Sequence, residues 1–200
     1  MINLTGINFK SRPIYTAKLK QPLFFFPALK TEKNVYISEL EASDEKRMGK
    51  LLKSWCGTTY GGYIIKNFLE EIKTKLSSSK LMFKRFYIVE NSKGDIKGLA
   101  MAEINQGSVN LALLQSEREK KGKRALNGVG SCLVYAVSKL ASSLKMNNVS
   151  ISSLPEAINF YKYIGAEKVG IKGSELSIKK CDFNDIQHSL EQKYNINTLI

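Results

Sequence analysis

Two stretches in the first half of the chain repeat apolar residues at helical spacing. They follow a β-rich run that holds Val35, Ile37 and Leu40, and the first begins near Ser43, whose side chain is suited to cap a helix N-terminus. The apolar positions are Met48, Leu51, Leu52 and Trp55 in the first stretch, and Ile65, Phe68, Leu69, Ile72 and Leu76 in the second. A strand followed by two helices is therefore predicted for residues 34–76.

The middle of the chain has the pattern of a sheet with helices packed on it. Three apolar runs, at residues 81–90, 96–104 and 108–115, are separated by short polar turns, as in an antiparallel meander. An apolar stripe from Val129 to Leu144 indicates a long helix, and residues 149–153 a buried strand. Pro155 opens and Gly165 follows a short helix, and residues 168–171 and 175–178 are expected to pair as a hairpin.

The two ends of the chain have weaker patterns. Residues 1–33 contain three of the four prolines, which remove backbone donors, so we expect an extended N-terminal arm with one short strand at most. The stretch 182–194 is polar and holds the lone histidine, His188, which we expect to face solvent. Residues 34–200 are predicted to form one mixed α/β (α+β) domain, with a central, mostly antiparallel sheet flanked by helices.

Composition adds a strong positive charge to this picture. A chain of 200 residues with 43% hydrophobic side chains can bury a core without a metal or a disulfide. Because no apolar run is long enough to span a membrane and no cleavable signal peptide is evident, we expect a cytoplasmic protein, with secretion by a non-cleaved signal left open. The net charge of +13 favours anionic partners, namely phosphates, acidic proteins or nucleic acid.

The three cysteines, Cys56, Cys132 and Cys181, have a spacing that fits no zinc, haem or thioredoxin-like motif. We therefore expect reduced thiols and no metal site. Cys132 falls on the apolar stripe of the predicted long helix, where a buried thiol packs as a small hydrophobic group.

Basic residues and glycines gather just before that helix, in the stretch KGKRALNGVGS. Gly128 and Gly130 would let the backbone approach a ligand that a Cβ atom would block, and N–H groups at the helix start would point at this ligand. The helix dipole and the charges of Lys121, Lys123 and Arg124 favour a phosphate as the guest. The motif is neither a P-loop, since Gly-Lys-Ser/Thr is missing, nor a complete dinucleotide fingerprint, which needs a third glycine.

LNGVGSCL, followed by SSLPEAINFYKYIGAEKV, resembles the GNAT family of acyl-coenzyme A dependent N-acetyltransferases, over roughly residues 34–180. In that family a loop of the form Gln/Arg-x-x-Gly-x-Gly/Ala cradles the coenzyme A pyrophosphate, and its glycines match Gly128 and Gly130. The position of the loop's basic residue is Ala125 here, and Arg124 lies one residue earlier. This departure puts the side-chain contact in doubt but leaves backbone N–H binding intact.

The family's second motif, a helix with an aromatic pair and a glycine after it, matches Phe160, Tyr161 and Gly165, with Leu154 in place of the common asparagine. The resemblance implies that Tyr161 protonates the departing thiolate, whereas outside the family context it would be a core aromatic residue. Coenzyme contacts are implied for Leu113, Leu114, Lys123, Arg124, Ala125, Asn127, Gly128, Val129, Gly130, Ser131 and Tyr161. Two carboxylates, Glu103 and Glu117, are candidates for the general base, and Glu103 is the one we select.

The resemblance implies an enzyme that transfers acetyl directly from acetyl-CoA to an amine, without an acyl-enzyme intermediate or a metal. The acceptor is left open among a protein lysine or N-terminus, a polyamine-like molecule, an antibiotic and an aminoacyl-tRNA, although the charge of +13 makes polycations less attractive. The oligomeric state is also open, as monomer or homodimer. The alternative is a catalytically inactive basic module of the same fold that binds nucleic acid or an acidic protein through residues 1–34 and 118–124.

Overall fold

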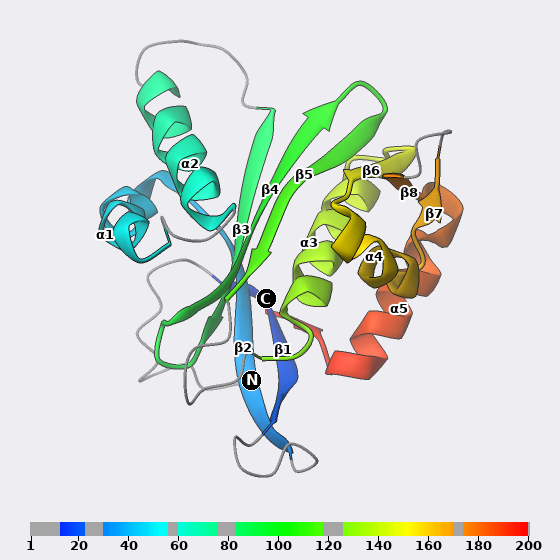
Figure 1. Cartoon of the computed structure of the whole chain (residues 1–200), viewed down its shortest axis with the longest axis horizontal. Helices are drawn as coiled ribbons and strands as arrows, with labels where there is room; N and C mark the ends of the chain where they lie inside the picture. Colours follow the sequence, from blue (N-terminus) through cyan, green and yellow to red (C-terminus); the bar gives the residue numbers. More distant parts are fainter. Residues whose placement is uncertain are drawn as a thin grey trace.

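The computed structural model describes residues 13–22, 30–55, 60–75, 83–117, 126–169 and 174–199. Nine strands form one sheet in the order β7-β8-β6-β5-β4-β3-β2-β1-β9, and every pairing is antiparallel except that of β5 with β6 (Figure 1). The strands are β1 (Pro13–Pro22), β2 (Lys30–Glu39), β3 (Lys84–Asn91), β4 (Ile96–Asn105), β5 (Ser108–Ser116), β6 (Asn148–Ser152), β7 (Glu167–Lys168), β8 (Glu175–Lys179) and β9 (Asn197–Thr198). The predicted mixed, mostly antiparallel sheet is confirmed.

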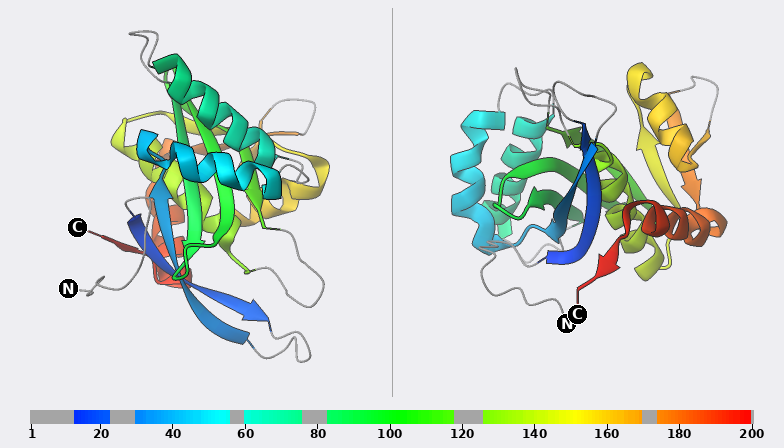
Figure 2. Two further views of the ribbon diagram at one scale, coloured as in Figure 1. Left: turned by 90° about the vertical axis from the view of Figure 1, so that its left-hand side faces the viewer. Right: turned by 90° about the horizontal axis from the view of Figure 1, so that it is seen from below.

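Among the described residues, five α-helices cover the two faces of the sheet (Figure 2). They are α1 (Glu45–Trp55), α2 (Gly61–Lys75), α3 (Val129–Ser143), α4 (Ile158–Ile164) and α5 (Phe183–Tyr194). The helices α1 and α2 pack on one face of the sheet, and α3 and α5 on the other. Within the described residues, no helix combines the length and apolar character that a membrane crossing requires.

Strand β4 shows how the side-chain alternation of the sheet divides the core in two. Ala100 and Ala102 belong to the cluster around α3, whereas Leu99 and Met101 belong to the cluster under α1 and α2. Each face of β4 is therefore covered by helices, which explains why this strand reads as a nearly continuous apolar run in the sequence.

The N-terminal segment is more regular than the sequence indicated. Strand β1 pairs with β2 along almost its whole length, and Ala17 and Leu19 point into the core while Lys18 and Lys20 face solvent. Two of the three prolines that suggested an irregular arm, Pro13 and Pro22, stand at the two ends of β1, where a missing donor is tolerated, and Pro27 lies outside the described residues. The predicted boundary at residue 33 falls inside β2, so the described part of the predicted arm is part of the sheet.

The helices α1 and α2 are confirmed, but the predicted cap of α1 is wrong. Ser43 lies within a short 3-10 turn (Ala42–Asp44) that precedes α1. The side chain of Asp44 accepts a hydrogen bond of 3.0 Å from the backbone N–H of Glu41 and so closes that turn. The polar group that orders this helix entrance is therefore a carboxylate, one residue after the predicted serine.

Helix α3 is the most buried helix of the protein, as its apolar stripe predicts. Cys132 is fully buried on it, and burial raises the pKa of the thiol to about 12, so the thiol stays protonated and packs as an apolar group. Cys181 is exposed, and Cys56 lies outside the described residues.

Helix α5 was not predicted. Its buried residues Phe183, Ile186 and Leu190 stand at positions i, i+3 and i+7, and the polar residues between them concealed this sparse stripe. Gln187 adds a hydrogen bond of 3.0 Å from its amide to Ser142 Oγ on α3. His188 is exposed, as expected.

A buried phenol links α3 to α5 and gives a first testable prediction. The Tyr135 hydroxyl donates a hydrogen bond of 2.7 Å to Glu191 Oε1, and Lys139 Nζ lies 3.0 Å from the same oxygen. Partial burial acts to raise the pKa of Glu191, but these hydrogen bonds outweigh it and hold the pKa below 4.5. Tyr135→Phe is expected to lower the free energy of unfolding by about 1–2 kcal/mol at neutral pH.

The pH dependence of this loss follows from the direction of the Glu191 shift. Because the folded pKa is lowered, the stabilisation is complete above about pH 4.5 and is lost as the pH falls through the folded value. Urea unfolding of the parent and of Tyr135→Phe near pH 7 and pH 3 would measure the loss of stability at each pH. Tyr163→Phe is the control, because the Tyr163 side chain is 67% exposed. An equal loss at both pH values would contradict the role given to Glu191.

Candidate active site

The pairing of β5 with β6 ends halfway along β5. Their parallel pairing runs from Ser108↔Asn148 to Leu111↔Ile151 and ends there, whereas β5 stays paired with β4 as far as Ser116. At the same point the β4–β5 register shifts, because Met101 is opposite Leu113 and Ala102 is opposite Leu111, so Ala112 is an extra residue. This bulge turns the backbone of β5 where the pairing with β6 stops.

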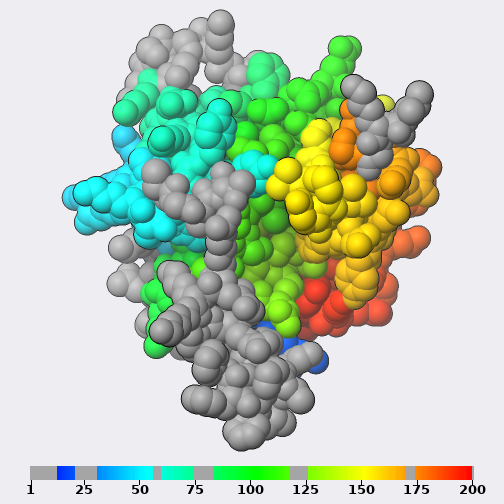
Figure 3. Space-filling model, viewed as in Figure 1, coloured from blue at the N-terminus to red at the C-terminus, as the bar shows by residue number. Residues whose placement is uncertain are grey.

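A pocket of about 260 Å³ lies at this divergence. Its lining comes from β5, from the end of β6 with the turn after it, from α4 and from the residue before α2; the residues are Tyr60, Leu111, Ala112, Leu113, Leu114, Gln115, Ser152, Ser153, Leu154, Ala157 and Tyr161. In the space-filling view, α2 in turquoise and α4 in yellow stand on either side of the green surface of the central strands (Figure 3). The pocket thus joins parts of the chain that are about a hundred residues apart.

Tyr161 is the predicted catalytic residue, and the structure places it in the lining of this pocket. Its side chain is 7% exposed and its ring packs edge-on against Phe160, with ring centroids 4.9 Å apart. Burial, with a smaller contribution from nearby Tyr60, raises the pKa of Tyr161 to about 12. At neutral pH the phenol therefore keeps its proton and can donate it to an atom in the pocket.

Sequence reasoning missed Tyr60 and the polar residues on the opposite wall of the pocket. Tyr60 precedes α2 and its carbonyl accepts the N–H of Ile64 at 2.8 Å, which fixes it to the start of that helix. Ser152 is the last residue of β6, and Ser153 follows it directly. The positions after a strand that pairs in parallel are common binding sites in α/β folds, and this was the available signal for the two serines.

Helix α3 begins at the predicted glycine loop. Gly128 is its N-cap residue, and the first bond within the helix runs from the N–H of Cys132 to the carbonyl of Gly128, at 3.0 Å. The N–H groups of Val129, Gly130 and Ser131 therefore have no acceptor inside the helix. Together with the helix dipole, these groups form an arrangement that suits an anion.

The structure gives the two glycines a different packing role from the predicted one. A Cβ atom on Gly128 would lie 2.5 Å from Tyr194 Cε1, and one on Gly130 would lie 2.8 Å from Phe160 Cζ. Gly128 also has a φ of +98°, which other residues rarely adopt. The missing Cβ atoms thus make room for two aromatic rings of the protein itself, and the expected contact of the two glycines with a ligand stays a prediction.

Three further predicted coenzyme contacts, Asn127, Val129 and Ser131, lie at this helix start. The backbone N–H of Asn127 donates to the Lys20 carbonyl at 3.1 Å, which ties the loop to β1. Val129 is buried, and Ser131 Oγ lies 3.4 Å from the Tyr194 hydroxyl. Lys123, Arg124 and Ala125 lie outside the described residues, as does Lys121.

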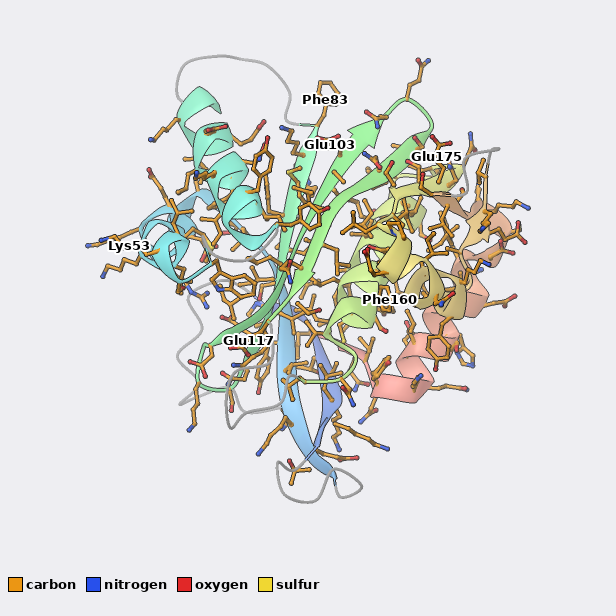
Figure 4. All side chains as sticks on the ribbon, viewed as in Figure 1. Lys53, Phe83, Glu103, Glu117, Phe160 and Glu175 are labelled. Atoms are coloured by element: carbon orange, nitrogen blue, oxygen red, sulfur yellow. The ribbon has the colours of Figure 1, made fainter. Side chains whose placement is uncertain are left out.

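The two candidate bases are not part of the pocket's lining. Glu103 lies near the end of β4, opposite Asn110, and Glu117 follows the far end of β5, so they stand toward opposite ends of the strands (Figure 4). Glu117 Oε2 accepts a hydrogen bond of 2.9 Å from Lys97 Nζ, an ammonium group that is almost fully buried. Glu117 therefore already has an ion-pair partner within the protein.

Known proteins share this architecture at low sequence identity. No family model and no curated protein sequence matches the chain. A chimera of the Vibrio cholerae spermidine N-acetyltransferase SpeG and hSSAT, K23-Q34, aligns with a TM-score of 0.54 and 17% identity over 76% of this chain and 98% of that one. The K23-Y30 chimera of the same two proteins aligns with a TM-score of 0.52 and 19% identity over 74% of this chain and 98% of its own.

A third solved structure, AtaTR bound with AcCoA, aligns with a TM-score of 0.51 and 18% identity over 80% of this chain and 97% of its own. These similarities extend over nearly the whole length of the matched chains. The chain therefore has the GNAT fold, which is also the fold of acetyl-CoA dependent N-acetyltransferases.

Proposed function

We propose that this protein is an N-acetyltransferase that moves an acetyl group from acetyl-CoA directly to an amine. The observation that carries the proposal is the pocket at the divergence of β5 and β6, in whose lining the buried, protonated Tyr161 lies. The start of α3, whose first N–H groups have no acceptor inside the helix, provides a separate place for the coenzyme phosphates. The fold shared with known acetyltransferases supports the same reading.

Acetyl-CoA fits the groups that the fold leaves available. The N–H groups of Val129, Gly130 and Ser131 would bind the pyrophosphate, with Lys123 and Arg124 proposed to flank it. Beyond Leu111, β5 is paired with β4 alone among the described strands, so backbone groups near Leu113 and Leu114 would be free to bond the amides of the pantetheine arm.

The proposed chemistry assigns separate tasks to Tyr161, to the backbone of β5 and to Glu103. The bound thioester supplies an acyl group that an amine can attack. Tyr161 would give its hydroxyl proton to the departing sulfur, and backbone N–H groups in the bulged part of β5 would face the negative charge that develops on the acyl oxygen. Glu103 remains the proposed final proton acceptor, acting through water from the end of β4 after the C–N bond has formed.

Acetyl-CoA is expected to raise the melting temperature of the protein. A ligand that binds only the folded state adds about 2.7 kcal/mol of stability at a hundred times its dissociation constant, which corresponds to roughly 5–10 °C for a domain of this size. Thermal melts with millimolar acetyl-CoA would measure the shift, with equal concentrations of ATP as a control for non-specific binding of polyanions. Equal shifts with both ligands, or no shift, would refute the coenzyme site.

Transfer itself is tested by incubating the protein with isotopically labelled acetyl-CoA and separate pools of protein, tRNA and small metabolites. Mass measurement of each pool should find the label on an amine in at least one of them, and the label should be much reduced with Tyr161→Phe. Binding of acetyl-CoA without label in any pool would favour the alternative, an inactive module that only docks on its partner.

A further inference from the structure

All the described residues that line the pocket around Tyr161 have neutral side chains. Its polar side chains are the hydroxyls of Tyr60, Tyr161, Ser152 and Ser153 and the amide of Gln115, and its other lining side chains are apolar. An amine that attacks the thioester has to do so among these groups. The lining therefore determines in which protonation state that amine arrives.

The acidic residues of the chain are placed elsewhere. All of them except Glu119 lie within the described residues, and none of the described ones lines the pocket. Glu156 is the carboxylate nearest in sequence to the wall formed by Leu154 and Ala157, and it is exposed. Glu117 is paired with Lys97, and Glu90 is fully buried in a pair with Arg47. A cation that entered the pocket would thus contact hydroxyl and apolar groups of the described lining and would find no carboxylate there to pair with.

Burial in such a lining disfavours charge of either sign. The same loss of water that raises the pKa of Tyr161 to about 12 lowers the pKa of an amine beside it. An acceptor must therefore be neutral when it enters, or lose its proton at a free-energy cost of 1.36 kcal/mol for each unit between its pKa and the pH. This cost separates two kinds of biological amine.

Alkylammonium groups and α-amines differ strongly in this cost. A lysine side chain has a pKa near 10.4 and an α-amino group one near 7.7–8.0. At about pH 7.5, roughly a third of α-amines are neutral but only about one lysine amine in a thousand. The described lining of the pocket has no carboxylate that could take the proton from a lysine amine as it enters. The difference in neutral fraction between the two kinds of amine therefore remains.

We infer that the acceptor of this site is an α-amine, such as a peptide N-terminus or the amino group of an aminoacyl ester, and is not a lysine side chain or a polyamine. The inference rests on the proposed acetyltransferase function. In the reaction, the lone pair of the neutral amine forms the C–N bond, the C–S bond breaks, and the sulfur takes the Tyr161 proton. The extra proton of the new amide nitrogen leaves through water, and Tyr161 is reprotonated from water, so an amide and free coenzyme A result.

Two isomeric peptides test the inference directly. Both have the same sequence with one lysine; one is acetylated beforehand at its N-terminus and offers only the ε-amine, and the other is acetylated at the lysine and offers only the α-amine. We expect the α-amine isomer to react at least tenfold faster at about pH 7.5, with roughly 250-fold as the ratio set by the neutral fractions alone. Spermidine is expected to react as slowly as the ε-amine isomer.

A calorimetric titration with coenzyme A separates failure of this inference from failure of the proposed function. If coenzyme A binds and the ε-amine isomer or spermidine reacts as fast as the α-amine isomer, or if no isomer reacts, the inference is overturned while the coenzyme site stands. If coenzyme A does not bind, the proposed function fails, and the inference falls with it.

A charge placed in the pocket provides the converse test. Leu154 lines the pocket and is 47% exposed, so a larger polar side chain there can be tolerated by the fold. Leu154→Glu is expected to raise the rate of the ε-amine isomer relative to the α-amine isomer by about tenfold or more compared with the matched Leu154→Gln variant, because only Glu supplies a base and a counter-ion. The same ratio in both variants would overturn the claim that the neutral lining selects the amine.

Discussion

Replacing Tyr161 with phenylalanine is expected to slow acetyl transfer by roughly 10²- to 10⁴-fold, with little change in the fold or in coenzyme affinity. The ring would still pack against Phe160 and fill its place in the pocket, so only the hydroxyl is lost. That hydroxyl is the proposed acid for the departing sulfur, and its raised pKa keeps it protonated through the physiological range. Water can replace it in part, which favours the lower end of the range.

The measurement is turnover at saturating substrates, together with coenzyme titration and a thermal melt of the same preparation. Tyr135→Phe is the matched control, since it removes another hydroxyl of a buried tyrosine that lies on α3, outside the lining of the pocket. A parent-like turnover for Tyr161→Phe, in a reaction limited by chemistry, would show that Tyr161 is a packing residue. A loss in turnover matched by the control would mean that the effect comes from general loosening of the core.

The core of the domain could be predicted because periodicity, turns and burial agree there. Helix α3 has apolar residues on nearly every side, the meander β3–β5 is bounded by short polar turns, and Gly165 ends α4 with a φ of +103°. Local sequence also located Tyr161, since the motif PEAINFYKYIG marks its helix and its place on that helix. These features depend on neighbours within a few residues along the chain.

Features that depend on distant contacts were missed. Strand β1 is a strand because β2 offers it a partner, and α5 is a helix because its thin apolar stripe meets α3. Tyr60 reaches the pocket only through the packing of α2 beside β5, and no pattern around residue 60 reports that packing. The bulge at Ala112 is likewise a property of the β4–β5 pair and not of LALLQ alone.

The glycine loop shows how a correct location can be predicted for an incomplete reason. Sequence reasoning found the start of α3 and expected both glycines to face a ligand. The backbone N–H groups are placed there as expected, but the missing Cβ atoms make space for Tyr194 and Phe160. These glycines therefore have a role in packing inside the protein that does not depend on a ligand.

This distinction leads to opposite expectations for Gly128→Val. If Gly128 faced a ligand, the substitution would weaken coenzyme binding more than folding. In the structure it forces a branched residue to adopt a φ of +98° and brings a Cβ to 2.5 Å from Tyr194 and 3.0 Å from Leu19. Backbone strain of about 1–3 kcal/mol and overpacking of a similar size should together lower the free energy of unfolding by roughly 2–6 kcal/mol.

Urea unfolding would measure this loss, and Gly128→Ala, which has the same strain with a smaller side chain, keeps the comparison possible if the valine variant does not fold. Gly49→Ala is the matched control, because its Cβ meets nothing within 4 Å and Gly49 lies inside α1, where alanine favours the helix by up to about 1 kcal/mol. We expect the control to be as stable as the parent or more so. Parent-like stability of both Gly128 variants, combined with a loss of coenzyme affinity, would show instead that the Gly128 Cα faces the phosphates.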